Sequence, residues 1–390
     1  MPLTCIMIIA GEASGDLHGA KLAQSIKKQA VDAFIFGIGG SAMQKEGVRT
    51  FVDAEALSVV GITEVISKLP TIYRAMAAVK KALQRIKPDL LILIDFPDFN
   101  FHAAAAAKKL DIPVLYYISP QIWAWRQNRV KKIKRLVDHM AVILPFEASF
   151  YRRHQVPVTF VGHPLLDRIA PQPSRREVLA DTAKPTIGLL PGSREKEVST
   201  LLPIMLQAAQ IVTRSLPATR FLVSCSESIR EDQIIHLVRR YRSTLDIEMV
   251  RGGVEQVFAR SRMLVAASGT VTLEAALYGL PLVIVYKVSP FSYLLGKWLI
   301  KVKYIGLVNL IVQKELMPEL IQHDASPHTI ARKVVHMVKS KNELRRIESQ
   351  LPLVRRLLGG AGASDRVATI ALDLIRRMRV DPSANLLSAK

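Results

Sequence analysis

Short, uniformly apolar runs alternate with longer segments of helical periodicity along most of this chain. In the first half we expect the apolar runs to form strands, at residues 4–10, 33–38, 90–94, 114–119 and 140–144. A polar or glycine-containing turn follows these runs, and a helix is expected after the first turn, through about residue 29. Strands that are apolar at every position are typical of a parallel sheet covered by helices on both faces.

The same alternation resumes in the second half, where the expected strands are residues 186–190, 220–224, 246–250, 263–267 and 282–285. Between the two series, residues 164–185 contain four prolines among charged residues, which indicates an interdomain linker. The pattern therefore predicts an α/β protein with two doubly wound halves and a cleft between them. The predicted domains are residues 1–168, residues 169–345 and a helical tail, residues 346–390.

The tail is predicted to be helical over about residues 342–378, with an interruption at the glycine-rich residues 359–362. It packs either across the first domain or onto a partner subunit, and the sequence leaves both arrangements, and hence a homodimer, open.

The chain is strongly basic: 54 Lys and Arg residues against 33 Asp and Glu residues give a net charge of +21. Such an excess indicates a polyanionic partner: nucleic acid, an anionic lipid surface or a phosphorylated substrate. Cys5 and Cys225 lie in different apolar runs, so we expect no disulfide and a reducing compartment. We expect neither a signal peptide at the N-terminus nor a membrane-spanning segment.

The stretch on which the predicted site is centred is AASGTVTLEAALYGLP, residues 266–281. A strand, the small-residue turn Ser268-Gly269-Thr270 and a helix N-terminus together form a site for an anion, because free N–H groups and the helix dipole point at it. Glu274, one turn into the helix, would reach the hydroxyl groups of a ribose. The alternative is simple helix capping, but Glu274 lies four residues after Thr270, whereas a capping box needs three.

Residues 189–197, LLPGSREKE, repeat this pattern at the first strand of the second half. Gly192 allows a close backbone approach, Ser193 is a candidate helix cap, and Arg194 offers several donors to a phosphate. The alternative is a well-capped helix with a solvated arginine.

Four carboxylates lie at the predicted strand ends of the first half: Glu12, Asp16, Asp95 and Asp98. Asp98 follows Pro97 between two aromatic residues and is a candidate general base toward an alcohol. Asp95 ends an apolar strand and would cap the turn that follows. No metal-binding spacing of His or Cys and no Walker A motif occurs, so we expect neither metal nor cofactor.

Three segments combine apolar and basic residues: residues 59–86, 116–135 and 290–304. Each alone is typical of an ordinary amphipathic core helix, whereas three in one chain favour a membrane surface or an acyl-bearing substrate. Aromatic residues beside the basic residues of 116–135 would also suit stacking on nucleic-acid bases.

Seven segments in order resemble the lipid-A-disaccharide synthase family: AGEASGD (10–16), VVGITEV (59–65), IDFPDFN (94–100), YYISPQIWAWRQNRV (116–130), FVGHPLLD (160–167), LLPGSR (189–194) and ASGTVTLE (267–274). The resemblance runs from about residue 4 to about residue 321. It implies a GT-B glycosyltransferase with two Rossmann-like domains facing a central cleft.

The reaction that the resemblance implies joins UDP-2,3-diacylglucosamine to 2,3-diacylglucosamine 1-phosphate, releasing UDP and the β-1,6-linked disaccharide 1-phosphate of lipid A. It inverts the anomeric centre and uses no metal. The implied location is the cytoplasmic face of the inner membrane of a Gram-negative cell, as a peripheral protein on an anionic surface, with no nucleic-acid partner.

Roles for individual residues also come from this resemblance. Asp98 is the implied base, and Arg194 supports the diphosphate. The implied UDP-binding residues are Gly192, Ser193, Ser268, Gly269, Thr270, Glu274, Asn309 and Gln313. The implied acceptor-binding residues are Glu12, Ser14, Gly15 and Asp16.

Two other functions stay open. One is a UDP-N-acetylglucosamine 2-epimerase, or a transferase to a soluble acceptor, on the same fold; the apolar residues 59–86 argue against it. The other is a basic nucleic-acid-binding protein that would use residues 116–135, with steeply salt-dependent binding and no turnover.

Overall fold

The computed structural model describes residues 4–57, 62–170, 184–226, 228–290, 293–294, 296 and 302–380, with side chains at 62–67 left aside. Parts of three predicted segments therefore lie outside the described residues: the start of VVGITEV, most of the linker and most of residues 290–304. The chain forms two compact units, residues 1–167 with 358–390 (unit 1) and residues 168–357 (unit 2).

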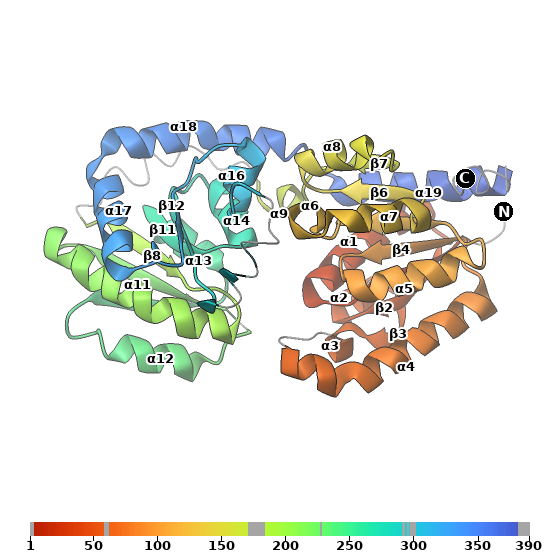
Figure 1. Ribbon diagram of the computed structural model, residues 1–390, viewed down its shortest axis with the longest axis horizontal. Coiled ribbons are helices and arrows are strands. Elements are labelled where there is room, and N and C mark those ends of the chain that lie inside the picture. Colours follow the sequence, from red (N-terminus) through yellow and green to blue (C-terminus); the bar gives the residue numbers. More distant parts are fainter. Residues whose placement is uncertain are drawn as a thin grey trace. The chain divides into compact units, whose positions relative to one another are not determined.

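Unit 1 contains a seven-stranded parallel sheet in the order β3-β2-β1-β4-β5-β6-β7 (Figure 1). Its strands are β1 (Cys5–Ala10), β2 (Phe34–Gly39), β3 (Arg49–Asp53), β4 (Leu90–Ile94), β5 (Val114–Tyr117), β6 (His139–Val142) and β7 (Val158–Phe160). Its helices are α1 (Ala13–Gln29), α2 (Ser41–Lys45), α3 (Ala54–Leu57), α4 (Ile62–Ile86), α5 (Pro97–Lys108), α6 (Ile122–Trp125), η1 (Gln127–Arg129), α7 (Val130–Leu136), α8 (Pro145–Arg153), α9 (Leu165–Arg168, ending at the unit boundary) and α19 (Ala363–Val380).

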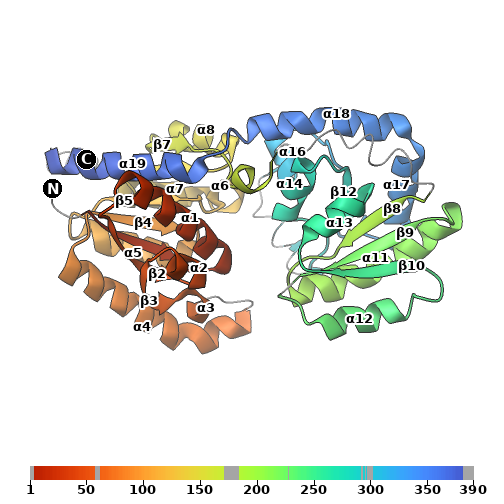
Figure 2. The same ribbon diagram turned by 180° about the vertical axis from the view of Figure 1, so that it is seen from behind.

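Helices cover both faces of this sheet, and β1 and β4 are therefore buried along almost their whole length. Helices α5 and α7 lie on one face (Figure 1), and α1 and α19 lie side by side on the other (Figure 2). The C-terminal helix α19 therefore completes unit 1, where its residues Val367, Ala368, Ala371 and Ile375 enter the same apolar core as β1 and β4.

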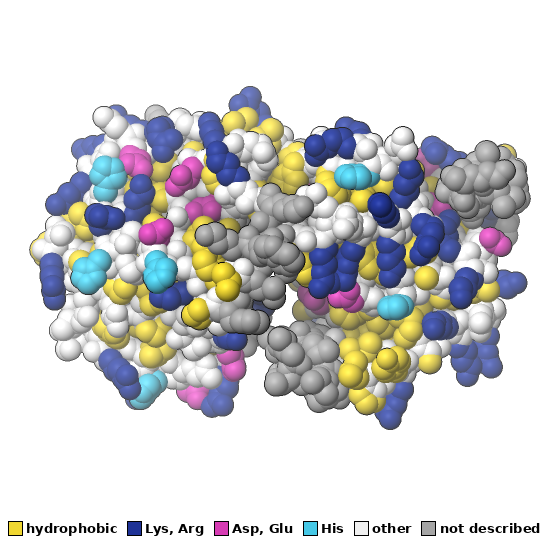
Figure 3. Space-filling view, viewed as in Figure 1, with side chains coloured by type: hydrophobic (Ala, Val, Ile, Leu, Met, Phe, Trp, Pro, Cys, Tyr) yellow, Lys and Arg dark blue, Asp and Glu magenta, His cyan; other side chains and the backbone are white. Residues whose placement is uncertain are grey.

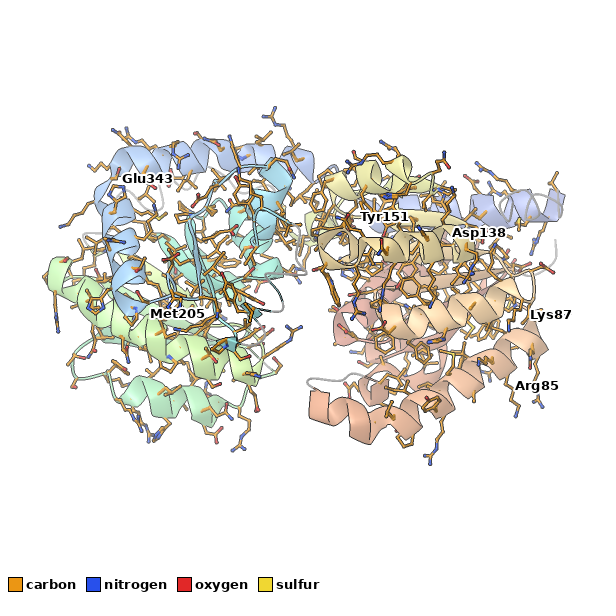
Figure 4. The ribbon with its side chains drawn as sticks, in the orientation of Figure 1. Arg85, Lys87, Asp138, Tyr151, Met205 and Glu343 are labelled. Atoms are coloured by element: carbon orange, nitrogen blue, oxygen red, sulfur yellow. The ribbon has the colours of Figure 1, made fainter. Side chains whose placement is uncertain are left out.

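Unit 2 contains a six-stranded parallel sheet in the order β10-β9-β8-β11-β12-β13. Its strands are β8 (Thr186–Leu190), β9 (Arg220–Cys225), β10 (Asp246–Arg251), β11 (Met263–Ala267), β12 (Leu282–Tyr286) and β13 (Glu319–Ile321). Its helices include α11 (Glu195–Ser215), α12 (Glu231–Arg239), α13 (Val254–Arg260), α14 (Thr270–Leu277), α16 (Leu307–Val312), α17 (Pro327–Lys339) and α18 (Lys341–Leu357). Met205, labelled in Figure 4, is one of the side chains that α11 buries completely.

The predicted α/β architecture is confirmed, and all ten expected strands occur with ends within two residues of those predicted. Three further strands were missed. β3 is an edge strand that alternates exposed and half-buried residues, and β7 and β13 have three residues each, too few for a recognisable pattern. The boundary after residue 167 lies beside the predicted one, whereas unit 2 extends to residue 357, beyond the predicted 345.

Each sheet reverses its strand order at one point, because the chain winds outward first to one side and then to the other. In unit 1 the reversal lies between β1 and β4, and in unit 2 it lies between β8 and β11. Ligands of doubly wound sheets bind in the crevice at the carboxyl ends of these central strands. None of the described helices is long and apolar enough to cross a bilayer.

Candidate functional site

A pocket of about 460 Å³ opens at the strand-order reversal of unit 2. It is lined by Leu190, Gly192, Ser193, Arg194, Glu197, Ser224, Cys225, Ser226, Gly253, Val254, Ala267, Ser268, Gly269, Thr270 and Val271. Five of the predicted UDP-binding residues are among them, together with Arg194, and all six come from the two turns that the sequence pattern singled out. The pocket is thus built from the ends of neighbouring strands.

The first turn connects β8 to α11. Gly192 has a φ of +115°, and a side chain there would collide with Glu197, so only glycine fits. Arg194 is the N-cap residue of α11 and makes no side-chain cap, so the expectation that Ser193 caps this helix is wrong. Arg194 is exposed, and its Nη1 lies 3.2 Å from Oε1 of Glu197, so its guanidinium can move to an anion without leaving a buried charge behind.

The second turn connects β11 to α14. The backbone N–H of Ser268 donates to Val285 at 3.1 Å, and the hydroxyl donates to the carbonyl of Ile305 at 3.3 Å. Gly269 is the N-cap residue, and no side chain caps α14. The N-termini of α11 and α14 thus both reach the pocket without a capping side chain, an arrangement that suits a diphosphate.

Glu274 lies one turn into α14 and is largely buried. Its Oε1 accepts a hydrogen bond of 2.5 Å from Nη2 of Arg168, and both residues belong to unit 2. Burial raises the pKa of the Glu274 carboxyl, and the positive charge of Arg168 opposes that rise. One arginine therefore holds the carboxylate in position. Glu274 follows the lining residues Thr270 and Val271 on α14 but does not itself line the pocket.

Asn309 lies in α16 and Gln313 directly follows that helix, and both have hydrogen-bond partners in the segment from α16 to β13. Asn309 is fully buried; its amide nitrogen donates to Met317 and Glu319, and its oxygen accepts the N–H groups of Leu316 and Met317, at 2.7–2.9 Å. Gln313 ends α16 in the left-handed region with a φ of +56°. Neither is among the residues that line the pocket, and the bonds of Asn309 fix the segment that follows α16.

The residues that β9 and β10 bring to this pocket were not predicted: Ser224, Cys225, Ser226 and Gly253. Both strands had been predicted. Because the carboxyl ends of parallel strands meet at one edge of a sheet, the last residues of these two strands could have been assigned to the pocket.

In unit 1 the strand-order reversal brings Asp95, at the end of β4, close to Glu12, after β1. Asp95 and Phe96 have φ values of +44° and +47°, and left-handed backbone costs roughly 1–2 kcal/mol for each such residue. Two donors hold this turn, since Tyr116 Oη and Asn100 Nδ2 each lie 2.6 Å from the backbone oxygen of Asp95. Strained turns held in this way are concentrated at functional sites.

The Asp95 carboxyl is partly buried, and this burial raises its pKa to about 6. The negative charge of Glu12 adds to the rise, while the N–H of Phe96 opposes it. Gly11 lies directly against the Phe96 ring, where any side chain would collide with it. A carboxyl group with this pKa can accept a proton near neutral pH.

Asp98 lies in the first turn of α5 and is far more open. Its side chain is 80% exposed, and Oδ1 lies 2.8 Å from Nη2 of Arg129. Asp98 and Asp95 thus stand in different surroundings, although they are only three positions apart in the sequence.

The remaining acceptor-side residues lie at the start of α1. Glu12 and Ser14 are exposed, and Gly15 packs against Ala10 and Ile94. Asp16 is buried, and its carboxylate accepts three backbone N–H groups at the N-terminus of α2. Within the described part of the chain, no group of three or more His, Cys, Asp and Glu side chains is arranged to hold a metal ion.

Solved structures share this fold. A UDP-GlcNAc 2-epimerase from Neisseria meningitidis bound to UDP-GlcNAc matches with a TM-score of 0.65 at 11% identity, over 95% of this chain and 100% of that one. A glycosyltransferase from Rickettsia africae matches with a TM-score of 0.54 at 10% identity, over 98% of both chains. At these identities the likeness shows the fold alone, and that fold is GT-B.

Sequence comparison is more specific. The family model described as lipid-A-disaccharide synthetase matches residues 6–370. A lipid-A-disaccharide synthase of Geobacter metallireducens is 44% identical over 379 residues, covering 96% of this chain and 98% of the relative. One of Syntrophus aciditrophicus is 45% identical over 378 residues, covering 95% and 98%. The protein therefore belongs to the lipid-A-disaccharide synthase family.

Proposed function

We infer that this protein is the glycosyltransferase that forms the lipid A disaccharide, with UDP-2,3-diacylglucosamine as donor and 2,3-diacylglucosamine 1-phosphate as acceptor. The observation that supports the donor is the pocket of unit 2, in which two uncapped helix N-termini and Arg194 meet. One helix terminus contributes only about 0.3–2 kcal/mol to an anion, so two termini and a mobile arginine suit a diphosphate that leaves without a metal.

The reaction needs a base for the acceptor hydroxyl. The base takes the proton of the acceptor 6-hydroxyl while the oxygen of that hydroxyl bonds to the anomeric carbon of the donor. On the opposite face of this carbon, the bond to the UDP oxygen breaks and UDP leaves. Two carboxylates are candidates. Asp95 suits this task better than Asp98, because it is held at the strand-order reversal with a pKa near 6, whereas Asp98 is exposed and paired with Arg129.

We also propose a peripheral membrane contact through α4. Leu69 is 39% exposed and Tyr73 is 72% exposed, and Figure 3 shows apolar and basic side chains gathered over this helix. Such a surface suits the interface of an anionic bilayer. Leu69→Gln combined with Tyr73→Gln should weaken binding to vesicles that contain phosphatidylglycerol; unchanged binding would exclude this contact.

The direct test is UDP release from UDP-2,3-diacylglucosamine in neutral detergent micelles with EDTA, with and without the acceptor. Acceptor-dependent release together with a disaccharide product is the expected result. UDP binding without acceptor-dependent release would contradict the proposal. The epimerase alternative is not favoured, because only fold likeness at about 11% identity supports it.

A further inference from the structure

A rigid basic arm follows β5 in unit 1. It consists of α6, η1 and α7, and it carries Arg126, Arg129 and Lys132 at intervals of three residues. Arg126 stacks on the half-exposed ring of Trp125, with its guanidinium carbon 4.1 Å from the ring centroid. Arg129 and Lys132 both lie over the ring of Phe101, at 5.7 and 5.0 Å.

The three cations have little neutralising charge. Asp98 pairs with Arg129, and the structure gives neither Arg126 nor Lys132 an ion pair with any of the described acidic residues. Three positive charges and one negative charge leave a local excess of +2. A phosphate monoester carries roughly −1.5 to −2 at pH 7, so the charges match. Figure 3 shows Lys and Arg side chains gathered over the face of unit 1 that carries α5 and α7.

Buried contacts hold the start of the arm in place. The indole Nε1 of Trp123 donates a hydrogen bond of 3.0 Å to Oε1 of Glu147, which is 2% exposed. Gln127 Nε2 donates to the backbone oxygen of Trp123 at 2.9 Å, and Ile122 is buried. A second buried bond, 2.6 Å between Ser119 Oγ and the hydroxyl of Tyr151 (labelled in Figure 4), fixes the residues just before α6. Cations on a preorganised segment bind an anion at a lower entropic cost.

The arm lies at the same sheet edge as the candidate base. It follows β5, the neighbour of β4, and Asp95 follows β4. Asp98 links the two, since it lies three residues after Asp95 and touches Arg129.

We propose that Arg126, Arg129 and Lys132 bind the phosphate of the acceptor sugar, and that Arg129 exchanges Asp98 for this phosphate when the acceptor enters. This inference rests on the proposed function, in which the acceptor carries its phosphate at one end of the ring and its reacting hydroxyl at the other. The arm then determines which acceptor binds, and Asp95 removes the proton from the acceptor hydroxyl.

The test compares two acceptors in neutral detergent: 2,3-diacylglucosamine 1-phosphate and the same sugar without phosphate. The wild-type enzyme should prefer the phosphorylated acceptor. The double variant Arg126→Gln/Arg129→Gln should lower kcat/KM for that acceptor by roughly ten- to a hundredfold, mainly through KM, because bonds to charged groups are lost. Its kcat/KM for the unphosphorylated acceptor should stay within about twofold of wild type, so the preference collapses.

The matched control is Lys131→Gln/Arg135→Gln, which removes the same charge from exposed positions of α7 and should leave the preference unchanged. Equal losses on both acceptors, or no loss on either, would overturn the inference. Binding to vesicles with phosphatidylglycerol is measured in parallel. If the double variant lost vesicle binding but kept its preference, the cations would serve a lipid headgroup and the inference would fall.

Failure of the proposed function looks different. In that case the wild-type enzyme itself would form no disaccharide from either acceptor, and this inference would fall with it. A wild-type enzyme that works, with a double variant that keeps the preference, would remove the phosphate subsite alone.

Discussion

The carboxylate of Asp16 accepts the backbone N–H of Gly40 at 2.7 Å, and it also accepts those of Ala42 and Met43 at 2.9 and 3.1 Å. Asp16 is 6% exposed, so these bonds form away from water. One side chain on α1 thereby satisfies the N-terminus of α2 and fixes the end of β2. Asp16 thus has a structural task that is separate from the acceptor contact predicted for it.

Asp16→Asn should therefore destabilise the protein. An amide offers one acceptor oxygen where the carboxylate offers two, and its NH₂ group would face backbone donors. We expect a loss of roughly 1–3 kcal/mol in the free energy of unfolding, measured by urea denaturation. Asp32→Asn, in the exposed turn before β2, is the control and should change little. A stable Asp16→Asn protein with a raised acceptor KM would instead favour the direct binding role.

Turnover should distinguish Asp95 from Asp98. Asp95→Asn should lower kcat by roughly a hundred- to ten-thousandfold, the range for a lost general base. Asp98→Asn should have the smaller effect. Because a base must be deprotonated, and the Asp95 pKa is raised to about 6, wild-type kcat/KM should fall as the pH drops below about 6. A larger loss in Asp98→Asn would return the role of base to Asp98.

Asp95→Asn should also stabilise the fold. The folded-state pKa of Asp95, about 6, lies above its unfolded value near 4, so the native state holds the proton more tightly. Asp95 therefore costs no stability below pH 4, and its cost grows from pH 4 to pH 6 and persists above. After allowance for its partial exposure, we expect a gain of about 1–2 kcal/mol at pH 7 that vanishes near pH 4. Thermal unfolding of both proteins at the two pH values measures this difference, and equal gains at both would refute its electrostatic origin.

UDP affinity should depend on Glu274 more than on its partner. Glu274→Gln should raise the Kd for UDP roughly tenfold, because a charged acceptor for ribose hydroxyls is lost. Arg168→Gln breaks the same ion pair but keeps the carboxylate, and should change the Kd much less. Titration calorimetry gives both values. Equal losses would mean that the ion pair, rather than a ribose contact, supports the pocket.

Cys225 offers a label inside the proposed UDP site. It lines the pocket, whereas Cys5 lies on β1 of unit 1 and serves as an internal reference. Burial raises the pKa of both thiols, so alkylation should be followed at alkaline pH. Saturating UDP should slow alkylation of Cys225 at least severalfold and leave Cys5 unchanged. Equal rates with and without UDP would place the nucleotide elsewhere.

Sequence patterns predicted the parts of the fold that depend on continuous apolar strands and on turn chemistry. Strands such as β4 and β11 are apolar at every position, and the Gly192 turn requires a backbone that only glycine adopts easily. The turns at Ser193 and Ser268 were therefore placed at the pocket before any contact was known. Apolar strands and turn residues depend on neighbouring positions of the chain, so a single sequence is enough to predict them.

Features that depend on packing between distant residues could not be predicted. The raised pKa of Asp95 requires its burial and the nearby charge of Glu12, which the strand order of the sheet creates. The ion pair of Arg168 with Glu274 joins residues 106 positions apart. The four bonds of Asn309 likewise form only when the segment after α16 has folded back against that helix.

The return of α19 to unit 1 has a consequence for synthesis on the ribosome. Helix α1 leaves the exit tunnel early, but Val367, Ala368, Ala371 and Ile375, which share its core, are translated only after all of unit 2. Throughout that interval the nascent N-terminal unit presents an uncovered apolar face. Folding of unit 1 can therefore finish only after α19 has been synthesised, and a chain that stops before α19 would keep this apolar face uncovered although all seven strands of the sheet are present.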